Sequence, residues 1–114
     1  MRILFVENHA RFARLTTRQF LHEHEVTIVS SIAAARTALN QTFDVVLVDY
    51  DLDDGKGDAL IGELSQRNQR PRIVAISSHQ VGNAALMAAG ADMICDKMNF
   101  AKVAFVIAAL FETP

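Results

Sequence analysis

The chain has 114 residues, 51% of them hydrophobic, which suits one compact domain spanning residues 1–114 and leaves little room for a second. Its formal net charge of −2 gives no sign of a nucleic-acid-binding or membrane-surface protein. The single cysteine excludes an internal disulfide, and with no signal peptide or apolar run of membrane length we expect a cytoplasmic protein.

Short apolar runs alternate with longer segments of helical composition. The runs are rich in β-branched residues, as strands buried on both faces of a sheet are. The expected strands are residues 3–6, 26–29, 45–48, 73–76 and 93–95. The expected helices are residues 10–22, 31–40, 58–67, 81–89 and 99–111. Five β–α units in strict alternation predict an α/β fold in which helices cover both faces of a parallel sheet.

Several residues mark the expected helix ends. Ser30 or Ser31 is a candidate cap for the helix at 31–40, and Asp58 is a candidate to open the next one. Gly90 stands where a helix stop is expected.

The last predicted helix is apolar on more than one side. Its predicted core stripe comprises Phe100, Val103, Ala104, Ile107, Leu110 and Phe111. Phe105, with Ala101 and Ala109, points largely the other way. A helix that is apolar on both sides is usually covered on both sides, which predicts that this face binds a second copy or an output domain. The alternative is one exposed phenylalanine without a partner.

Polar side chains follow every predicted strand. They are Glu7 and Asn8, Ser30, Asp49, Ser77 and Ser78, and Asp96 and Lys97. In open parallel sheets the functional site lies beyond the carboxyl ends of the strands. Carboxylate and amide oxygens suit Mg²⁺, whereas lysine and hydroxyl donors suit phosphate oxygens. The sequence therefore predicts a site for a divalent cation and a phosphoryl group at this edge, with His9 beside it interpreted as an exposed loop histidine.

The stretch DYDLDD places four aspartates within six positions, residues 49–54. Its D-x-D-x-D pattern begins like an EF-hand calcium loop, which needs glycine at the sixth position and glutamate at the twelfth. Here those positions hold Asp54 and Leu60, and the stretch follows a strand instead of a helix. A calcium loop is therefore rejected.

Taken in order, these pieces resemble the receiver domain of two-component response regulators over residues 2–112. The matching segments are RILFVEN (2–8), VVLVDYDLDDGKG (45–57), IVAISSH (73–79) and AAGADMICDK (88–97). No single segment is very specific, but the ordered set on five β–α units is. The resemblance implies a doubly wound, flavodoxin-like (βα)5 fold with strand order 2-1-3-4-5.

The resemblance also implies a mechanism. Asp49 is the implied phosphoacceptor, taking a phosphoryl group from a phosphohistidine of a histidine kinase or histidine phosphotransfer protein. Lys97 pairs with a phosphate oxygen, and Ser77 follows the phosphoryl group and switches a face made of the fourth helix, fifth strand and fifth helix. The implied ligands of Mg²⁺ are Glu7, Asn8, Asp49 and the backbone carbonyl of Asp51. Such a domain is a signalling module in a phosphorelay, not an enzyme.

Four positions depart from the family pattern. Asn8 stands where a metal-binding aspartate is common, so weaker Mg²⁺ binding is expected. Asp53 replaces a loop proline and, with the neighbouring aspartates, is interpreted as a solvated turn. Met98 replaces a proline that follows a cis bond, so either a strained cis bond or a trans bond with a differently placed Lys97 is expected. Ile94 replaces the usual aromatic switch residue.

Two alternatives remain open. The departures favour a degenerate receiver that keeps the fold and acts as a phosphorylation-independent interaction module. An apolar strand followed by D-x-D also resembles the haloacid-dehalogenase-like phosphatases. In that family the aspartate follows the first strand, whereas two β–α units precede Asp49 here, and a later acidic pair for Mg²⁺ is missing.

Overall fold

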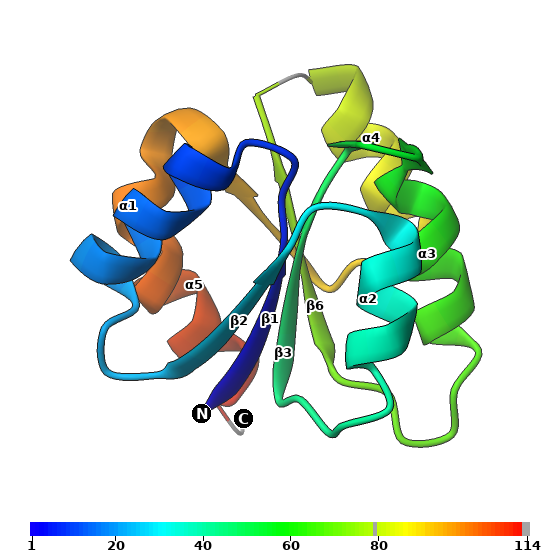
Figure 1. The fold of residues 1–114 in the computed structure, drawn as a ribbon, viewed down its shortest axis with the longest axis horizontal. Coiled ribbons are helices and arrows are strands. Elements are labelled where there is room, and N and C mark those ends of the chain that lie inside the picture. The colour runs from blue at the N-terminus through cyan, green and yellow to red at the C-terminus, as the bar shows by residue number, and fades with distance from the viewer. Residues whose placement is uncertain (79, 113–114) are drawn as a thin grey trace.

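The computed structural model describes residues 1–78 and 80–112 and has one five-stranded parallel sheet (Figure 1). Its strands are β1 (Arg2–Val6), β2 (Glu25–Val29), β3 (Val45–Asp49), β6 (Arg72–Ser77) and β7 (Met93–Asp96). The order across the sheet is β2-β1-β3-β6-β7, and all four pairings are parallel. This is order 2-1-3-4-5 for the five main strands, so the predicted fold is confirmed.

In the part of the chain that the structure describes, five α-helices pack on the two faces of the sheet. They are α1 (Ala10–Phe20), α2 (Ile32–Ala38), α3 (Gly57–Ser65), α4 (Gln80–Ala89) and α5 (Val103–Leu110), with the 3-10 helix η1 (Lys97–Lys102) before α5. Figure 1 shows α1 and α5 on one face and α2, α3 and α4 on the other. None of the helices in the described residues is long and apolar enough to span a membrane.

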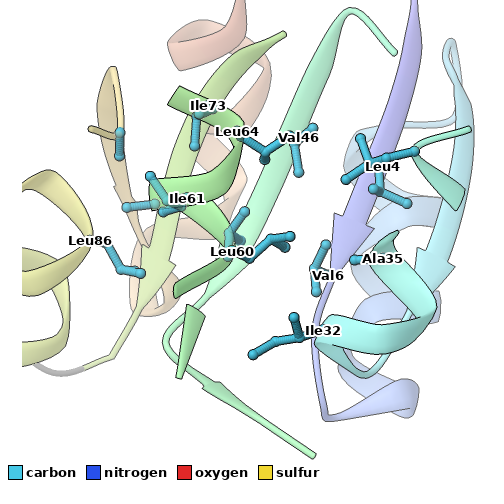
Figure 2. Close-up of a cluster of buried hydrophobic side chains, with 14 of the residues drawn as sticks. Leu4, Val6, Ile32, Ala35, Val46, Leu60, Ile61, Leu64, Ile73 and Leu86 are labelled. Carbon is cyan, nitrogen blue, oxygen red and sulfur yellow. The ribbon is translucent and has the colours of Figure 1, made fainter. Parts of the chain in front are cut away.

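Alternate residues of the central strands feed two separate cores. Leu4 and Val6 of β1 face α2 and α3, in the cluster that Figure 2 shows with Leu60 of α3. Ile3 and Phe5 of the same strand face α1 and α5. Because successive strand side chains point to opposite faces, a sheet covered on both sides needs uninterrupted apolar runs. This requirement explains why the strands were easy to predict.

The second core contains an aromatic cluster around Phe100 of η1. The rings of Phe5 and Phe100 stack, with centroids 5.5 Å apart and an interplanar angle of 4°. Phe12 meets Phe100 edge-on at 5.5 Å, and Phe20 lies 6.2 Å away. Aromatic pairs at these separations add to the free energy of burial. The cluster therefore fixes η1 against the sheet and α1.

The predicted helix over 99–111 is wrong at its beginning. Residues 97–102 form a 3-10 helix in which Asn99 has non-helical angles (φ −119°, ψ 36°), and the α-helix starts only at Val103. A 3-10 helix has three residues per turn, so the break changes which residues face the core. Ala104 and Phe111 are exposed, contrary to the predicted stripe, whereas Val106 is buried. Phe105 is 79% exposed, as predicted.

The segment after β3 forms a short hairpin that was predicted only as a loop. Its strands β4 (Asp51–Leu52) and β5 (Gly55–Lys56) pair antiparallel. At its turn the carboxylate of Asp54 accepts hydrogen bonds from the backbone N–H groups of Ile32 (2.7 Å) and Ala33 (3.1 Å). These bonds lower the pKa of Asp54. The predicted solvated turn is confirmed, since Asp53 and Asp54 are exposed in a turn, but the bonds by which Asp54 ties the hairpin to the start of α2 were not predicted.

The predicted helix ends are partly confirmed. Ser31 caps α2, its hydroxyl accepting from Ala34 N–H at 3.0 Å. Gly90 follows α4 with φ +124°, a conformation that favours glycine. Asp58 does not open α3, which begins at Gly57; it lies in the first turn, where a carboxylate is favourable.

Gly57 is the residue of α3 with the least space for a side chain. A Cβ there would lie 2.1 Å from the Asp49 carbonyl oxygen and 2.9 Å from a methyl of Val48. Gly57→Ala should therefore lower the free energy of unfolding by about 2 kcal/mol or more, as overpacking does. Gly62, in the same helix, has nothing within 4 Å of an added Cβ, so Gly62→Ala should raise it by about 0.5–1 kcal/mol. Urea denaturation followed by circular dichroism measures both, and equal effects would contradict this explanation.

Candidate functional site

Three strand ends bring an acid, a second acid and a lysine together. The β1–β3 register pairs Val6 with Val48, so Glu7 comes level with Asp49. Both carboxylates are buried, with exposed fractions of 0% and 5%. Lys97 Nζ lies 2.8 Å from Glu7 Oε1 and 3.4 Å from Asp49 Oδ1. The edge of the sheet therefore holds two buried acids that share one ammonium group.

Local contacts fix this arrangement from the side of β1. The backbone N–H of Glu7 donates to the Val29 carbonyl (2.9 Å), which extends the β1–β2 pairing by one residue. The second carboxylate oxygen of Glu7 accepts from the His9 backbone N–H at 3.0 Å. The Lys97 ammonium lies 5.1 Å from the centre of the Phe12 ring, within the range of a cation–π contact. Phe12 is a site neighbour that sequence reasoning missed, because only the packing of α1 against η1 brings it there.

Burial raises the pKa of Asp49 to about 6. That value is the net effect of burial, which is the largest cause, of the negative charge of Glu7, which also raises the pKa, and of Lys97, which lowers it. One lysine does not balance two carboxylates in a buried position, where charges are poorly screened. The site is therefore short of positive charge when both acids are ionised.

The absent proline after Lys97 does not displace this lysine. The described residues contain no cis peptide bond, so the Lys97–Met98 bond is trans. The Asp96 carboxylate accepts from the Met98 N–H at 2.8 Å and caps η1, while Phe100 anchors the same helix in the aromatic cluster. Of the two expectations for this bond, the trans form holds, and Lys97 still reaches both acids.

Ser77 lies at the same edge on β6. Its strand neighbour Ile76 is opposite Asp49, and Ser77 itself is opposite Asp96. Ser77 is buried, whereas Ser78 is exposed, which agrees with the choice of Ser77 as the candidate hydroxyl. A Cβ on Gly82 would lie 2.8 Å from Ser77 Oγ, so the first turns of α4 pack directly on this hydroxyl. A displacement of the Ser77 hydroxyl would therefore change its contact with Gly82 at the beginning of α4.

The oxygen donors at this edge fit a hard divalent cation. Asn8 Oδ1 is buried and accepts no hydrogen bond from any described residue. Beside it in the chain is Glu7, whose carboxylate lies near that of Asp49. A set of two carboxylates and an amide oxygen without a partner is what Mg²⁺ accepts. The carboxylate of Asp51 pairs with Lys56, and its backbone carbonyl as a ligand stays a prediction.

His9 belongs to this cluster in space as well as in sequence. Its side chain is 69% exposed, which confirms the predicted exposed loop position. Its Nδ1 nevertheless lies 3.4 Å from Glu7 Oε2. Within the described residues, Glu7, His9 and Asp49 form a group whose ligand atoms all lie within 4.8 Å of one another. In the sequence this placement was indicated by the position of His9, two residues after Glu7 at the end of β1.

Replacing Asp49 by asparagine should stabilise the metal-free protein at neutral pH. The pKa of Asp49 is about 6 in the fold against an ordinary value of 3.8, and a tenfold change in an acid constant is worth about 1.4 kcal/mol. The folded state therefore binds this proton more tightly, and its stability falls as the pH rises from about 4 to about 6. Asp49→Asn removes that loss. The free energy of unfolding of the variant should exceed that of the wild type by on the order of 1–3 kcal/mol above pH 6, and this difference should disappear below pH 4.

Urea titrations from pH 3.5 to pH 8 without divalent cations measure this difference. Asp53→Asn, at an exposed position of the same loop, is the matched control and should show no such trend. A stability gain of Asp49→Asn that is constant over this pH range would contradict the raised pKa.

Comparison with known proteins agrees with this geometry. A family model for the response regulator receiver domain matches residues 3–103. No curated protein matches the chain. The chain is similar to a CheY-like receiver domain protein from Methanospirillum hungatei JF-1, with 21% identity, a TM-score of 0.84 and coverage of 96% of this chain and 91% of that one.

Two further solved structures of similar fold are metal complexes. One is the response regulator TrrA from Thermotoga maritima in complex with Mg²⁺-BeF (19% identity, TM-score 0.84, covering 96% of this chain and 98% of that one). The other is the Mn²⁺-bound response regulator Rcp1 (20% identity, TM-score 0.79, covering 99% and 96%). At these identities the likeness shows the fold alone. The family model, in contrast, covers most of the chain, and the protein therefore belongs to the response regulator receiver domain family.

Proposed function

We propose that residues 1–114 form a single phosphoacceptor receiver domain of a cytoplasmic two-component system and that Asp49 takes the phosphoryl group. The observation that carries the proposal is the buried pair of Glu7 and Asp49 with Lys97 bridging them. The donor is a phosphohistidine on a histidine kinase or histidine phosphotransfer protein, the partners with which receiver domains interact in general.

The reaction is a transfer between two side chains. A carboxylate oxygen of Asp49 attacks the phosphorus, an O–P bond forms, and the P–N bond of the phosphohistidine breaks with its electron pair returning to the imidazole. A pKa of about 6 leaves Asp49 ionised, and so nucleophilic, at neutral pH. The ammonium of Lys97, now between the two acids, is within reach of an oxygen on the transferred group.

Mg²⁺ is the proposed cofactor, held by Glu7, Asn8, Asp49 and the backbone carbonyl of Asp51. When bound, it supplies the positive charge that the two acids lack and that a transferring phosphoryl group requires. The relatives solved with Mg²⁺-BeF and Mn²⁺ support a cation in this family's pocket. Asn8 offers an oxygen without the negative charge of an aspartate. The site should therefore bind Mg²⁺ more weakly than a site with aspartate at this position, but still bind it.

The proposed output passes through Ser77 to α4. Ser77 follows the phosphoryl group, and its contact with Gly82 transmits the movement to the face made of α4, β7 and α5. These elements carry the exposed apolar side chains Val81 and Met87 (α4), Ile94 (β7) and Phe105 (α5), with Met98 in η1 and Phe111 after α5. We propose that this face binds a second copy of the domain or an output domain.

A degenerate receiver that works without phosphorylation is the second candidate. Asn8, Ile94 and Met98 favour it. Against it, Lys97 keeps its contacts to both acids although Met98 replaces the proline. The match to receiver domains, which are signalling modules, counts against a phosphatase.

Intact-mass spectrometry after incubation with acetyl phosphate and Mg²⁺ tests the phosphoacceptor. We expect one phosphoryl adduct on the wild type, which needs Mg²⁺ and is released by hydroxylamine as an acyl phosphate should be. Asp49→Asn should carry none, whereas Asp53→Asn, an exposed neighbour, should be labelled like the wild type. No adduct under conditions that label an ordinary receiver would leave the degenerate module as the function.

A charge at Phe105 should weaken self-association through the proposed face. Phe105 is 79% exposed, and Phe105→Glu would bury an unpaired carboxylate in an apolar contact. Sedimentation velocity with Mg²⁺ and beryllofluoride should show a dimer for the wild type and a monomer for this variant. Leu15→Glu, at a half-exposed position of α1, is the control and should stay dimeric. A wild type that remains monomeric would rule out the second copy as occupant.

A further inference from the structure

The imidazole of His9 is not used to hold the fold together and can therefore bind a ligand. His9 precedes the first residue of α1, but its side chain makes no capping hydrogen bond (φ −92°, ψ 88°). His9 stabilises the fold through its backbone: its N–H donates to Glu7 Oε2, and its carbonyl accepts from Ala13 N–H at 3.0 Å. The ring is 69% exposed and is held near the site by one contact, Nδ1 to Glu7 Oε2 at 3.4 Å.

The geometry suits a shared cation. Ligand atoms of Glu7, His9 and Asp49 lie within 4.8 Å of one another. Two nitrogen or oxygen ligands about 2.1 Å from one ion lie at most about 4.2 Å apart. Atoms 4.8 Å apart exceed this limit by about 0.6 Å, so they must approach by at least that much to share one ion, and the exposed His9 ring is the member that can rotate to do so.

The chemistry of the set differs from that of an all-oxygen magnesium pocket. Asn8 contributes an oxygen without a negative charge, and His9 adds an aromatic nitrogen. Mg²⁺ prefers hard oxygen ligands, whereas imidazole suits Zn²⁺, Ni²⁺ and other later first-row ions. Losing a carboxylate lowers the attraction for every divalent cation, but gaining an imidazole raises it only for these later ions.

We propose that His9 is a ligand of the divalent cation in this pocket and makes the site select a late first-row transition ion, such as Co²⁺ or Zn²⁺, over Mg²⁺. This inference rests on the proposed function only in taking the Glu7–Asp49 pocket as the cation site. Mg²⁺ is then the weaker occupant, and it fills the site, as the proposed function requires, when no ion of this class is available.

Other nitrogen and sulfur ligands in the described residues do not explain such selectivity at this site. Cys95 is 3% exposed, and burial raises the pKa of its thiol, which opposes thiolate formation. His22 and His24 follow α1, and His24 contacts the amino group of Met1 at 3.3 Å. They lie at the opposite end of α1 from His9 and can be tested separately.

Isothermal titration calorimetry with Mg²⁺ and with Co²⁺ tests the proposal on wild-type protein and on His9→Asn. The side-chain amide of asparagine keeps a donor for Glu7 but offers no aromatic nitrogen. The ratio of the Mg²⁺ dissociation constant to the Co²⁺ dissociation constant should fall about tenfold or more in His9→Asn. The ratio is the right quantity, because Lys97 competes with both ions at Glu7.

Two controls locate the bound ion. His22→Gln, which removes an exposed imidazole far from the pocket, should leave the ratio unchanged, and Asp49→Asn should weaken both ions. The visible absorption of bound Co²⁺ should shift in His9→Asn, because a nitrogen ligand is lost, and should not shift in His22→Gln.

The outcomes separate this inference from the proposed function. A wild type that binds Co²⁺ no more tightly than Mg²⁺, an equal loss of both ions in His9→Asn, or Co²⁺ binding that survives Asp49→Asn would each overturn the role of His9. Labelling of wild-type Asp49 by acetyl phosphate with Mg²⁺ would still support the receiver function in all three cases. Absence of that labelling would instead count against the proposed function, whatever the metal preference.

Discussion

The burial of two like charges at one strand edge is the constraint on which this structure depends. Glu7 and Asp49 are almost without solvent contact, and Lys97 lies between them and offsets part of their charge. An unpaired buried charge is costly, so this edge lowers the stability of the fold in its metal-free state. The same cost favours the binding of a cation, because a cation supplies the positive charge that the two acids lack.

The surrounding structure holds these groups in place by contacts that are individually ordinary. Gly57 lets α3 pass within contact distance of the Asp49 carbonyl, and Asp54 ties the hairpin after Asp49 to α2. On the other side, Asp96 caps η1 and Phe100 anchors it, which positions Lys97 without the proline of the family pattern. These contacts show how a receiver keeps its central geometry while its sequence departs from the common motif.

Strand patterning was enough to predict the sheet and its functional edge, whereas features that depend on long-range contacts were missed. The apolar runs located all five main strands, and parallel pairing brings their ends together, so the meeting of Glu7, Asp49 and Lys97 at one edge was predicted, while their roles stay predictions. The cap that Asp54 gives α2 was missed, because it depends on two segments that meet only in the fold. The last helix was misplaced because a capped 3-10 turn interrupts an apolar pattern that looks continuous.

The most direct test of the account is the ionisation of Asp49 itself. Carbon-13 NMR of the side-chain carboxyl, assigned with Asp49→Asn, would follow its titration between pH 3 and pH 8. Without divalent cations we expect a pKa of about 6, caused first by burial and then by Glu7, and a much lower pKa once a cation occupies the site. An ordinary pKa near 3.8 in the metal-free protein, unchanged by added metal, would contradict the central claim.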